Sequence, residues 1–197
     1  FIYMSETLYE GYLAGKLLLA MPTMGDPRFH RSVIYMCNHD AAGAMGLVIN
    51  QVIPQMQFKD ILKELPLESD IEIDPAALNV PVMLGGPVDV GRGFLIHSSD
   101  FNETRTISVD HDFSITATID ALQAIAKGQG PDERMLILGY AGWDAGQLDE
   151  EIQNNSWLVT DADPALIFKI PHQDKWNIAV SGLGFDPNML ASDAGHA

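Results

Sequence analysis

The sequence predicts an α+β fold, a single domain in which helices flank a mixed, largely antiparallel sheet. Strand-like segments outnumber helical ones, several strands precede the first helix, and no strand is followed by the GxGxxG turn of dinucleotide-binding folds. The length of 197 residues suits one domain, which we assign to residues 17–197. We expect residues 1–16 to be an N-terminal segment, with Met4 as the natural start and residues 1–3 as either an upstream extension or a remnant of expression.

The first strands are predicted from short apolar segments. Residues 15–21 end before Pro22, which cannot donate a hydrogen bond to a sheet. Residues 32–38 are rich in β-branched and aromatic side chains, and residues 44–52 form an almost continuous apolar run. Such a run predicts a strand that is buried on both faces. Residues 40–43 between these strands are interpreted as a hairpin loop.

Two helices are predicted from apolar side chains that recur three and four residues apart. The first covers residues 57–65 and ends before Pro66. The second covers residues 118–127, and Gly128 supplies its C-terminal stop. Residues 68–80 are acidic and irregular, so we predict that they form a mobile loop.

Three strands are predicted between these helices, at residues 82–84, 93–97 and 104–109. The first ends in Gly85-Gly86-Pro87, which we interpret as a tight structural turn. Residues 110–112 place a histidine between two aspartates. Because neighbouring side chains on an extended segment point in opposite directions, we interpret them as a solvated turn and predict no metal site.

The C-terminal third begins with the clearest central strand, residues 135–138. Residues 139–144 are interpreted as the turn from this strand into a third helix, which Asp144 is predicted to cap with Gln147 in a capping box. The remaining predicted elements are an extended segment and two helices: residues 157–160, a helix that opens at Asp163-Pro164, and residues 172–180, in which Trp176 and residues 178–180 face inward.

Composition narrows the classes of partner and compartment. The formal net charge is −16, from 27 acidic and 11 basic residues, so direct binding to nucleic acid through a basic face is not expected. The one cysteine, Cys37, lies in an apolar run and is interpreted as a core residue of a protein in a reducing compartment. The apolar run at residues 17–21 is too short to span a bilayer. We therefore expect a cytoplasmic protein without membrane association.

Several motifs resemble those of the AlgH/YqgE family of bacterial proteins, and they cover nearly the whole chain. These motifs are Met21-Pro22 with Asp26-Pro27, residues 43–50 (GAMGLVIN), residues 84–88 (LGGPV), and residues 139–143 (GYAGW) with Asn155 and Trp157. The resemblance implies a mixed sheet that is curled toward a barrel, with helices around it. One branch of the family is named for regulation of alginate synthesis. The resemblance implies no agreed enzyme activity and no agreed catalytic residues.

The two glycine-rich segments are the first candidates for a ligand site. Gly85 and Gly86 could offer backbone N–H groups to an anion, although a structural turn is the favoured interpretation. Residues 139–143 follow a buried strand, where α/β sheets often bind ligands, and Tyr140 and Trp143 could contact one there. We favour close packing for this segment too, and expect Gly142→Val to destabilise the fold.

Polar side chains near these segments complete the set of candidate ligand-binding residues. His97 ends a predicted strand that Arg92 precedes, and near Asn50 or Tyr140 it could serve as an acid–base group. A hydrogen-bonded structural histidine is the favoured interpretation. The local cationic cluster, residues 28–31, could receive a carboxylate or phosphate, but we favour pairing with the chain's own acids.

No standard catalytic, cofactor or metal signature is present: the sequence has no GxSxG, HExxH, CxxC or Walker loop. Our leading hypothesis is a non-enzymatic regulatory or protein-interaction role, with any link to transcription being indirect. The alternative is a small-ligand-binding protein or enzyme with a pocket near the Gly85-Gly86 and Gly139–Trp143 segments. A pocket lined by Asn50, His97 and Trp143 would favour the alternative, and a filled core with an exposed apolar patch elsewhere would favour the leading hypothesis.

Overall fold

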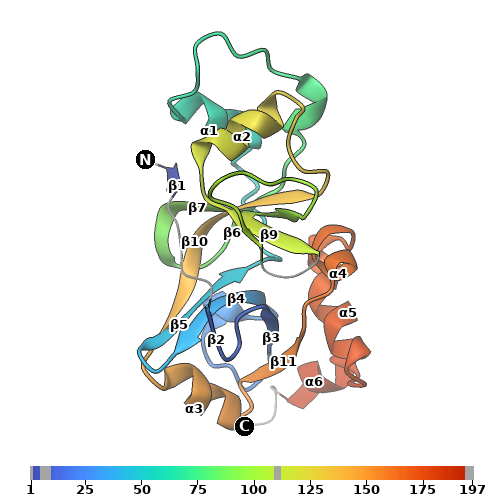
Figure 1. The fold of residues 1–197 in the computed structure, drawn as a ribbon. Coiled ribbons are helices and arrows are strands. Elements are labelled where there is room, and N and C mark those ends of the chain that lie inside the picture. Colours follow the sequence, from blue (N-terminus) through green and yellow to red (C-terminus); the bar gives the residue numbers. More distant parts are fainter. Residues whose placement is uncertain (1, 5–9, 109–111, 194–197) are drawn as a thin grey trace.

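A computed structural model describes residues 2–4, 10–108 and 112–193 of the chain. In this part of the chain eleven strands form one curled sheet, a half-barrel that helices flank (Figure 1). The main path of neighbouring strands is β11-β3-β4-β5-β10-β7-β9-β8. The strands are β1 (Tyr3–Met4), β2 (Glu10–Gly11), β3 (Lys16–Ala20), β4 (Val33–Asp40), β5 (Gly43–Val48), β6 (Val82–Leu84), β7 (Val88–Ser98), β8 (Ile107–Ser108), β9 (Phe113–Thr116), β10 (Arg134–Asp144) and β11 (Trp157–Asp161).

Strand β10 joins the two halves of the sheet. Its first part pairs antiparallel with β7 and parallel with β6, and its last four residues pair antiparallel with β5. The register shifts between Leu138 and Tyr140, where Gly139 has a φ of 74°. This bend carries β10 from the upper half of the sheet in Figure 1 to the lower half. Most of the described pairs are antiparallel and three are parallel, β1 with β7, β2 with β4 and β6 with β10, which confirms a mixed, largely antiparallel sheet.

The helices cover different parts of the sheet (Figure 1). Helices α1 and α2 lie over the upper half, α3 lies at the end of the lower half, and α4 to α6 run along one side. Their bounds are α1 (Phe58–Glu64), α2 (Ile119–Ala126), α3 (Gln147–Gln153), α4 (Pro164–Phe168), α5 (Lys175–Gly182) and α6 (Pro187–Asp193). The predicted apolar stripes of the first two helices are confirmed, since both pack on one cluster of the core.

Strand β3 and the end of β5, in the lower half of the sheet, are buried on both faces. In β3, Leu17 and Leu19 face the central core, whereas Leu18 and Ala20 face a second core beneath α3. Strand β5 alternates in the same way, with Leu47 in the central core and Val48 in the second. Successive side chains on a strand point to opposite faces, so a continuous apolar run supplies two cores. The two-sided burial predicted for residues 44–52 is confirmed for Leu47 and Val48, whereas Val52 is 48% exposed.

The largest error in the sequence predictions concerns residues 139–144. They are not a turn but the second half of β10, and the chain bends at Gly139 without leaving the sheet. Asp144 is not the helix cap, because α3 begins at Gln147 and Gly146 takes the cap position with a φ of 74°. Half of the expected capping box is present, since the Gln147 side-chain oxygen accepts a hydrogen bond from the Asp144 backbone N–H at 2.9 Å.

Other elements differ from the predictions in length or burial. The strand predicted at residues 93–97 is longer in the structure, where β7 covers Val88–Ser98. Strand β9 was not predicted, because it is short and half of its residues are polar. Of the strand predicted at residues 104–109, only Ile107–Ser108 is extended among the described residues, and residues 109–111 lie outside them. Ile178, predicted to face inward, is 46% exposed, because α5 packs through other positions, including Val180.

Candidate functional site

The two glycine-rich segments pack directly against each other. A Cβ atom at Gly85 would lie 2.3 Å from the carbonyl oxygen of Gly139, and one at Gly86 would lie 2.2 Å from the carbonyl of Tyr140. The Gly85 N–H donates to Leu138 O at 2.7 Å, and Gly85 O accepts from the Val48 N–H at 2.8 Å. Backbone therefore fills the space that a ligand between these segments would need, in line with the packing interpretation.

Gly142 differs from these glycines. It lies in β10 opposite Met45, its side-chain direction is open to solvent, and an added Cβ would meet only a ring carbon of Tyr140 at 3.7 Å. The expectation that Gly142→Val destabilises the fold is therefore not supported by the geometry, because the residue does not lie in a turn.

His97 is fully buried and both ring nitrogens are engaged. Nδ1 lies 2.7 Å from Ser98 O, and Nε2 lies 2.8 Å from Thr116 Oγ1. Burial lowers the pKa of His97 below its usual range, so the ring is neutral at pH 7. These contacts fit the interpretation of a structural histidine.

The structure does not bring the candidate residues into one site. His97 pairs with the first residue of β10, whereas Trp143 lies nine residues further along that strand, which spans up to roughly 30 Å. Trp143 is buried in the second core against Trp157, with ring centroids 5.9 Å apart. Arg92 and Tyr140 do meet, since the guanidinium carbon lies 5.6 Å from the Tyr140 ring centre.

A small pocket instead forms where the loop between β3 and β4 meets the start of α5. Its volume is about 160 Å³. Its inner lining is apolar and includes Ala20, Met21 and Trp176, which are buried. His30 and Arg31 are exposed and therefore lie at its outer side. Pro22 and Met24 complete the described lining, which contains no carboxylate.

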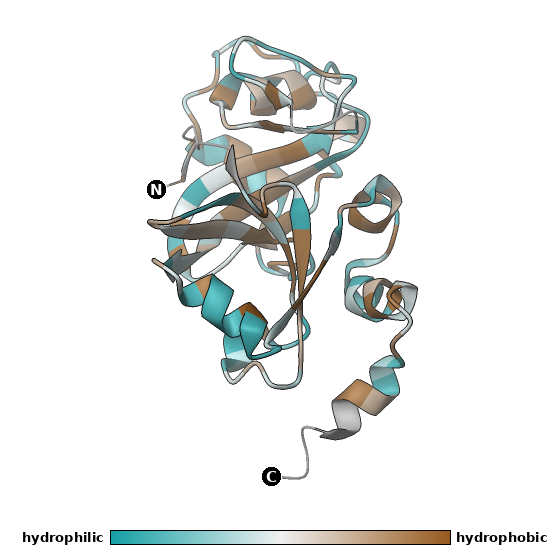
Figure 2. Cartoon of the chain, turned by 60° about the horizontal axis from the view of Figure 1, so that its bottom comes forward, coloured by the Kyte–Doolittle hydropathy of each residue, from teal (hydrophilic) through white to brown (hydrophobic). Residues whose placement is uncertain are grey.

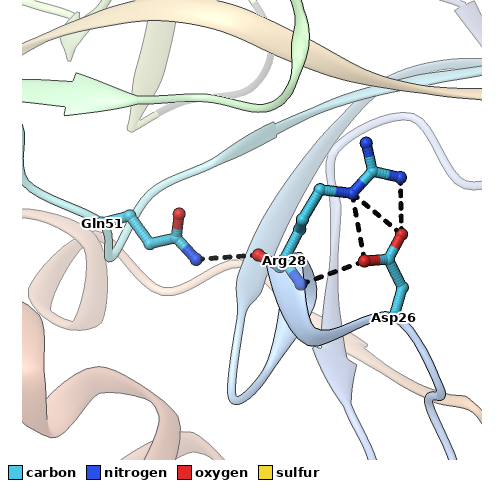
Figure 3. Close-up of polar contacts among 3 residues, drawn as sticks. All are labelled: Asp26, Arg28 and Gln51. Carbon is cyan, nitrogen blue, oxygen red and sulfur yellow. Dashed lines mark hydrogen bonds and ion pairs between the residues drawn. The ribbon is translucent and has the colours of Figure 1, made fainter.

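The cationic cluster at residues 28–31 divides into two parts with different partners. Arg28 forms an ion pair with Asp26 at 2.6 Å, and its backbone N–H donates to the same carboxylate at 3.0 Å (Figure 3). The Arg28 guanidinium lowers the pKa of Asp26 below its usual value. The Gln51 side-chain amide donates to Arg28 O at 3.1 Å (Figure 3). Arg28 therefore pairs with an acid of its own loop, as predicted.

Arg31 behaves differently. No ion pair joins it to another described residue, and its guanidinium carbon lies over the Trp176 ring, 5.1 Å from the ring centre. Its φ is 51°, a left-handed conformation that costs a residue with a side chain about 1–2 kcal/mol. Asn50 holds this conformation, because its Nδ2 donates to Arg31 O at 2.9 Å and its Oδ1 accepts from the Val33 N–H at 3.0 Å.

The opposite wall of the pocket is also fixed by hydrogen bonds. Trp176 Nε1 donates to Ala20 O at 2.9 Å. The adjacent Lys175 is fully buried, and its Nζ donates to Ile49 O at 3.2 Å and to Ile167 O at 2.6 Å. Burial lowers the pKa of Lys175 to about 8. A fixed indole and a buried ammonium group therefore support the wall that faces Arg31.

Sequence reasoning identified Asn50 and the cationic cluster but missed the pocket. Trp176 is 145 residues away from Arg31 in the chain, and no local pattern links the two. The positive φ of Arg31 has no sequence signature either, since glycine or asparagine usually occupies such positions. The useful signal was a cationic cluster in a chain with a net charge of −16.

The described residues include no metal-binding cluster, no reactive thiol and no membrane-spanning helix. No group of three or more His, Cys, Asp or Glu side chains in that part of the chain could hold a metal ion. Burial raises the pKa of the Cys37 thiol to about 12, so it carries no thiolate at neutral pH. Among the described helices, none has the length and apolar content needed to cross a bilayer.

The fold defines a class of protein: a single α+β domain with a curled half-barrel sheet that helices flank. The chain belongs to the AlgH-like family, whose model matches residues 17–188. It is 50% identical to a UPF0301 protein of Bradyrhizobium sp., over 98% of this chain and 91% of that protein. It is 49% identical to a UPF0301 protein of Rhodospirillum rubrum, over 96% of each.

Two solved structures share the fold. The AlgH protein from Pseudomonas aeruginosa superposes with a TM-score of 0.74 at 36% identity, over 98% of this chain and all of that one. Protein DIP2367 from Corynebacterium diphtheriae superposes with a TM-score of 0.67 at 20% identity, over 89% of this chain and 90% of that one. These matches confirm the family and the fold class, and their names state no biochemical activity.

Proposed function

We propose that this protein acts by binding another protein rather than by catalysis, and that the pocket beside Arg31 is a contact site. The small volume of this pocket supports a contact site for protein there, whereas more open hollows of about 420, 470 and 680 Å³ lie elsewhere on the described residues. Sites for small molecules usually measure about 300–1,000 Å³. At about 160 Å³, this pocket has room for about five water-sized groups, the size of one aliphatic side chain. A pocket of that size suits one residue presented by a larger partner.

The chemistry of the lining supports binding over catalysis. General acid–base catalysis needs a positioned group within hydrogen-bond reach of a reacting proton, and nucleophilic catalysis needs a nucleophile beside a base. Of the described lining residues only His30 belongs to the side-chain types that commonly serve as general acid or base, and no nucleophile accompanies it there. The Arg31 guanidinium donates hydrogen bonds and accepts none, so it serves as a binding group.

Exposed apolar side chains near the C-terminus offer further contact area for the same partner. Helix α5 carries Trp176 in the pocket and continues to Ile178, and Leu183, Phe185 and Met189 follow within thirteen residues of Trp176. These four side chains are 39–67% exposed. Helix α6 extends away from the sheet beyond α5 (Figure 2). Apolar groups exposed close together are typical of protein interfaces.

The proposed setting follows from composition. A chain with a single buried thiol suits the reducing cytoplasm. A net charge of −16 opposes direct contact with nucleic acid, so a regulatory role linked to transcription would act through a protein partner.

Affinity capture with a matched pair of variants tests this proposal. Wild-type protein, Arg31→Gln and Lys59→Gln are immobilised and exposed to native bacterial lysate, and bound proteins and metabolites are identified by mass spectrometry. Lys59 is an exposed cation on α1, away from the pocket. We expect one protein in stoichiometric amount on the wild type and on Lys59→Gln, and its loss on Arg31→Gln. Equal retention by Arg31→Gln, or a metabolite as the only ligand, would overturn the proposal.

A further inference from the structure

The pocket beside Arg31 has two chemically different parts, and together they specify a ligand. Resting on the proposed function, we infer that the pocket binds the C-terminal residue of a partner chain, with the free α-carboxylate on Arg31 and an aliphatic side chain on the apolar lining. Three properties support this ligand: the charge of the pocket, the shape of the group that fits it and the rigidity of its walls.

Charge selects an anion. The protein has 27 acidic side chains, yet none of the described ones lines the pocket, and the acid closest in the loop, Asp26, is paired with Arg28. A guanidinium carries five N–H donors in a planar fork, and no described carboxylate pairs with those of Arg31. Two such N–H groups match the two oxygens of a carboxylate. Arg31 is therefore equipped for an anionic ligand that the described part of the chain does not supply.

The apolar lining selects a carboxylate that is attached to a hydrocarbon group. Met21, Met24 and the Trp176 ring would stay unused against a phosphate or sulfate, which is polar on every side. Burying them against an aliphatic side chain gains about 25 cal/mol per Å² of apolar area, and methionine adapts readily to different shapes. The ligand must therefore present an anion and an apolar group close together.

The C-terminal residue of a protein has this arrangement. Its carboxylate and its side chain leave the same Cα atom in different directions, so one can meet Arg31 while the other enters the apolar part. An internal Glu or Asp carries its carboxylate at the tip of the side chain, so the charge would enter the apolar part first, at a desolvation cost. Capture of a terminal carboxylate is a recurring mode of peptide recognition.

The walls are held in place before a ligand binds. Asn50 fixes the strained backbone of Arg31, and the bond from Trp176 Nε1 to Ala20 O fixes the indole. Ordering a side chain on binding costs about 0.5–1.5 kcal/mol, and walls that are already ordered avoid this cost. Asn50, which the sequence suggests as a ligand contact, thus acts as a positioning residue.

The test is a titration with short peptides, followed through the indole N–H signals of ¹⁵N-labelled protein. The probe is a six-residue Gly/Ser peptide that ends in leucine with a free carboxylate. Its matched control is the same peptide with an amidated C-terminus. We expect the free acid to shift the Trp176 signal and to leave those of Trp143 and Trp157, which lie in the second core, unchanged. We expect the amide, and the free acid with Arg31→Gln, to bind at least tenfold more weakly, and Lys59→Gln to bind as the wild type does.

Three outcomes would overturn the inference. The first is equal binding of acid and amide, the second is equal binding of an amidated peptide with an internal glutamate, and the third is equal binding of free 4-methylpentanoate. In the second case the proposed function stands, because Arg31 still binds a protein, whereas in the third the ligand is a small molecule. Absence of any shift overturns the inference alone if lysate capture still depends on Arg31. Loss of that dependence as well overturns both proposals.

Discussion

Two regions of the molecule use left-handed backbone for different purposes. Where β10 passes from one half of the sheet to the other, the residue with a positive φ is Gly139, at 74°. In the pocket it is Arg31, at 51°. At the first position a Cβ would lie 2.7 Å from the carbonyl oxygen of Gly86, so only glycine fits. At the second, a long side chain persists although glycine would relieve the strain.

The positive φ values of Gly139 and Arg31 have different physical explanations. Glycine at the crossing is explained by packing alone, because backbone meets backbone there. A strained arginine is not explained by packing, since strain in a folded protein persists where the surroundings enforce it, often at binding sites. The crossing is therefore architectural, and the pocket is the better candidate for function.

The largest expected effect comes from adding one methyl group at the crossing. Gly86→Ala would place Cβ 2.2 Å from the Tyr140 carbonyl, so β10 has to move. We expect the free energy of unfolding to fall by at least about 3 kcal/mol, measured by urea denaturation.

The matched control lies three residues beyond Gly139 in the same strand. Gly142→Val adds a larger side chain at an exposed position where the nearest atom is 3.7 Å from the new Cβ. We expect a change of no more than about 0.5 kcal/mol. Equal destabilisation by both substitutions would mean that close backbone approach is not what demands glycine at the crossing.

The next effect concerns the group that holds Arg31. Asn50→Ala removes the acceptor of the buried Val33 N–H and the donor to Arg31 O. Leaving a buried donor unsatisfied costs about 1–3 kcal/mol, so we expect a loss of about 2 kcal/mol in urea denaturation. Gln51→Ala is the control, because its amide donates to Arg28 O in an exposed loop and should cost less than half as much. If Asn50→Ala left the free energy of unfolding unchanged, Asn50 would not be what stabilises the strained conformation of Arg31.

Sequence reasoning predicted most of the fold and little of the pocket, and the reason is physical. The strands at residues 15–21 and 32–38 followed from short apolar runs and β-branched composition, and the first two helices followed from the period of their apolar side chains. Both are local properties of the sequence. The pocket depends on which segments meet in space. Trp176 reaches Arg31 only because α5 packs on β3, and that contact depends on the whole chain.

The glycine-rich segment at residues 139–143 shows a subtler limit. Its composition correctly indicated close packing, but glycine is compatible both with a turn and with a bent strand. The segment is a strand because it pairs with β5, and the sequence of the segment alone does not show this pairing. Asn50 was identified as a polar group of interest, yet its role as a positioning residue depends on the conformation of Arg31.

A third prediction concerns the charge buried behind the pocket wall. Lys175 has a pKa of about 8 in the fold and 10.5 as its ordinary value. Between these values the unfolded chain holds a proton that the fold has lost, so rising pH favours the fold by up to about 1.4 kcal/mol per pH unit. Below pH 8 both states are protonated and this contribution is constant.

Lys175→Met removes the titrating group and keeps the length of the side chain. From pH 7.5 to pH 9, we expect the wild type to gain about 1 kcal/mol of unfolding free energy relative to this variant, measured by urea denaturation at both values. The absolute stability of the variant does not matter to this comparison. An unchanged difference between the two proteins would show that the ammonium group is not held at a lowered pKa.

The smallest effect tests the contrast between the two regions most directly. Arg31→Gly and Arg31→Ala both remove the guanidinium, so both should lose the capture partner and the peptide. They differ in backbone strain, because alanine keeps the left-handed penalty of about 1–2 kcal/mol while glycine exchanges it for an entropic cost of about 0.5–1 kcal/mol. We expect the glycine variant to be more stable by roughly 0.5–1 kcal/mol in urea denaturation. A more stable alanine variant would show that Arg31 is not strained, and its side chain would then need no functional reason to persist at this position.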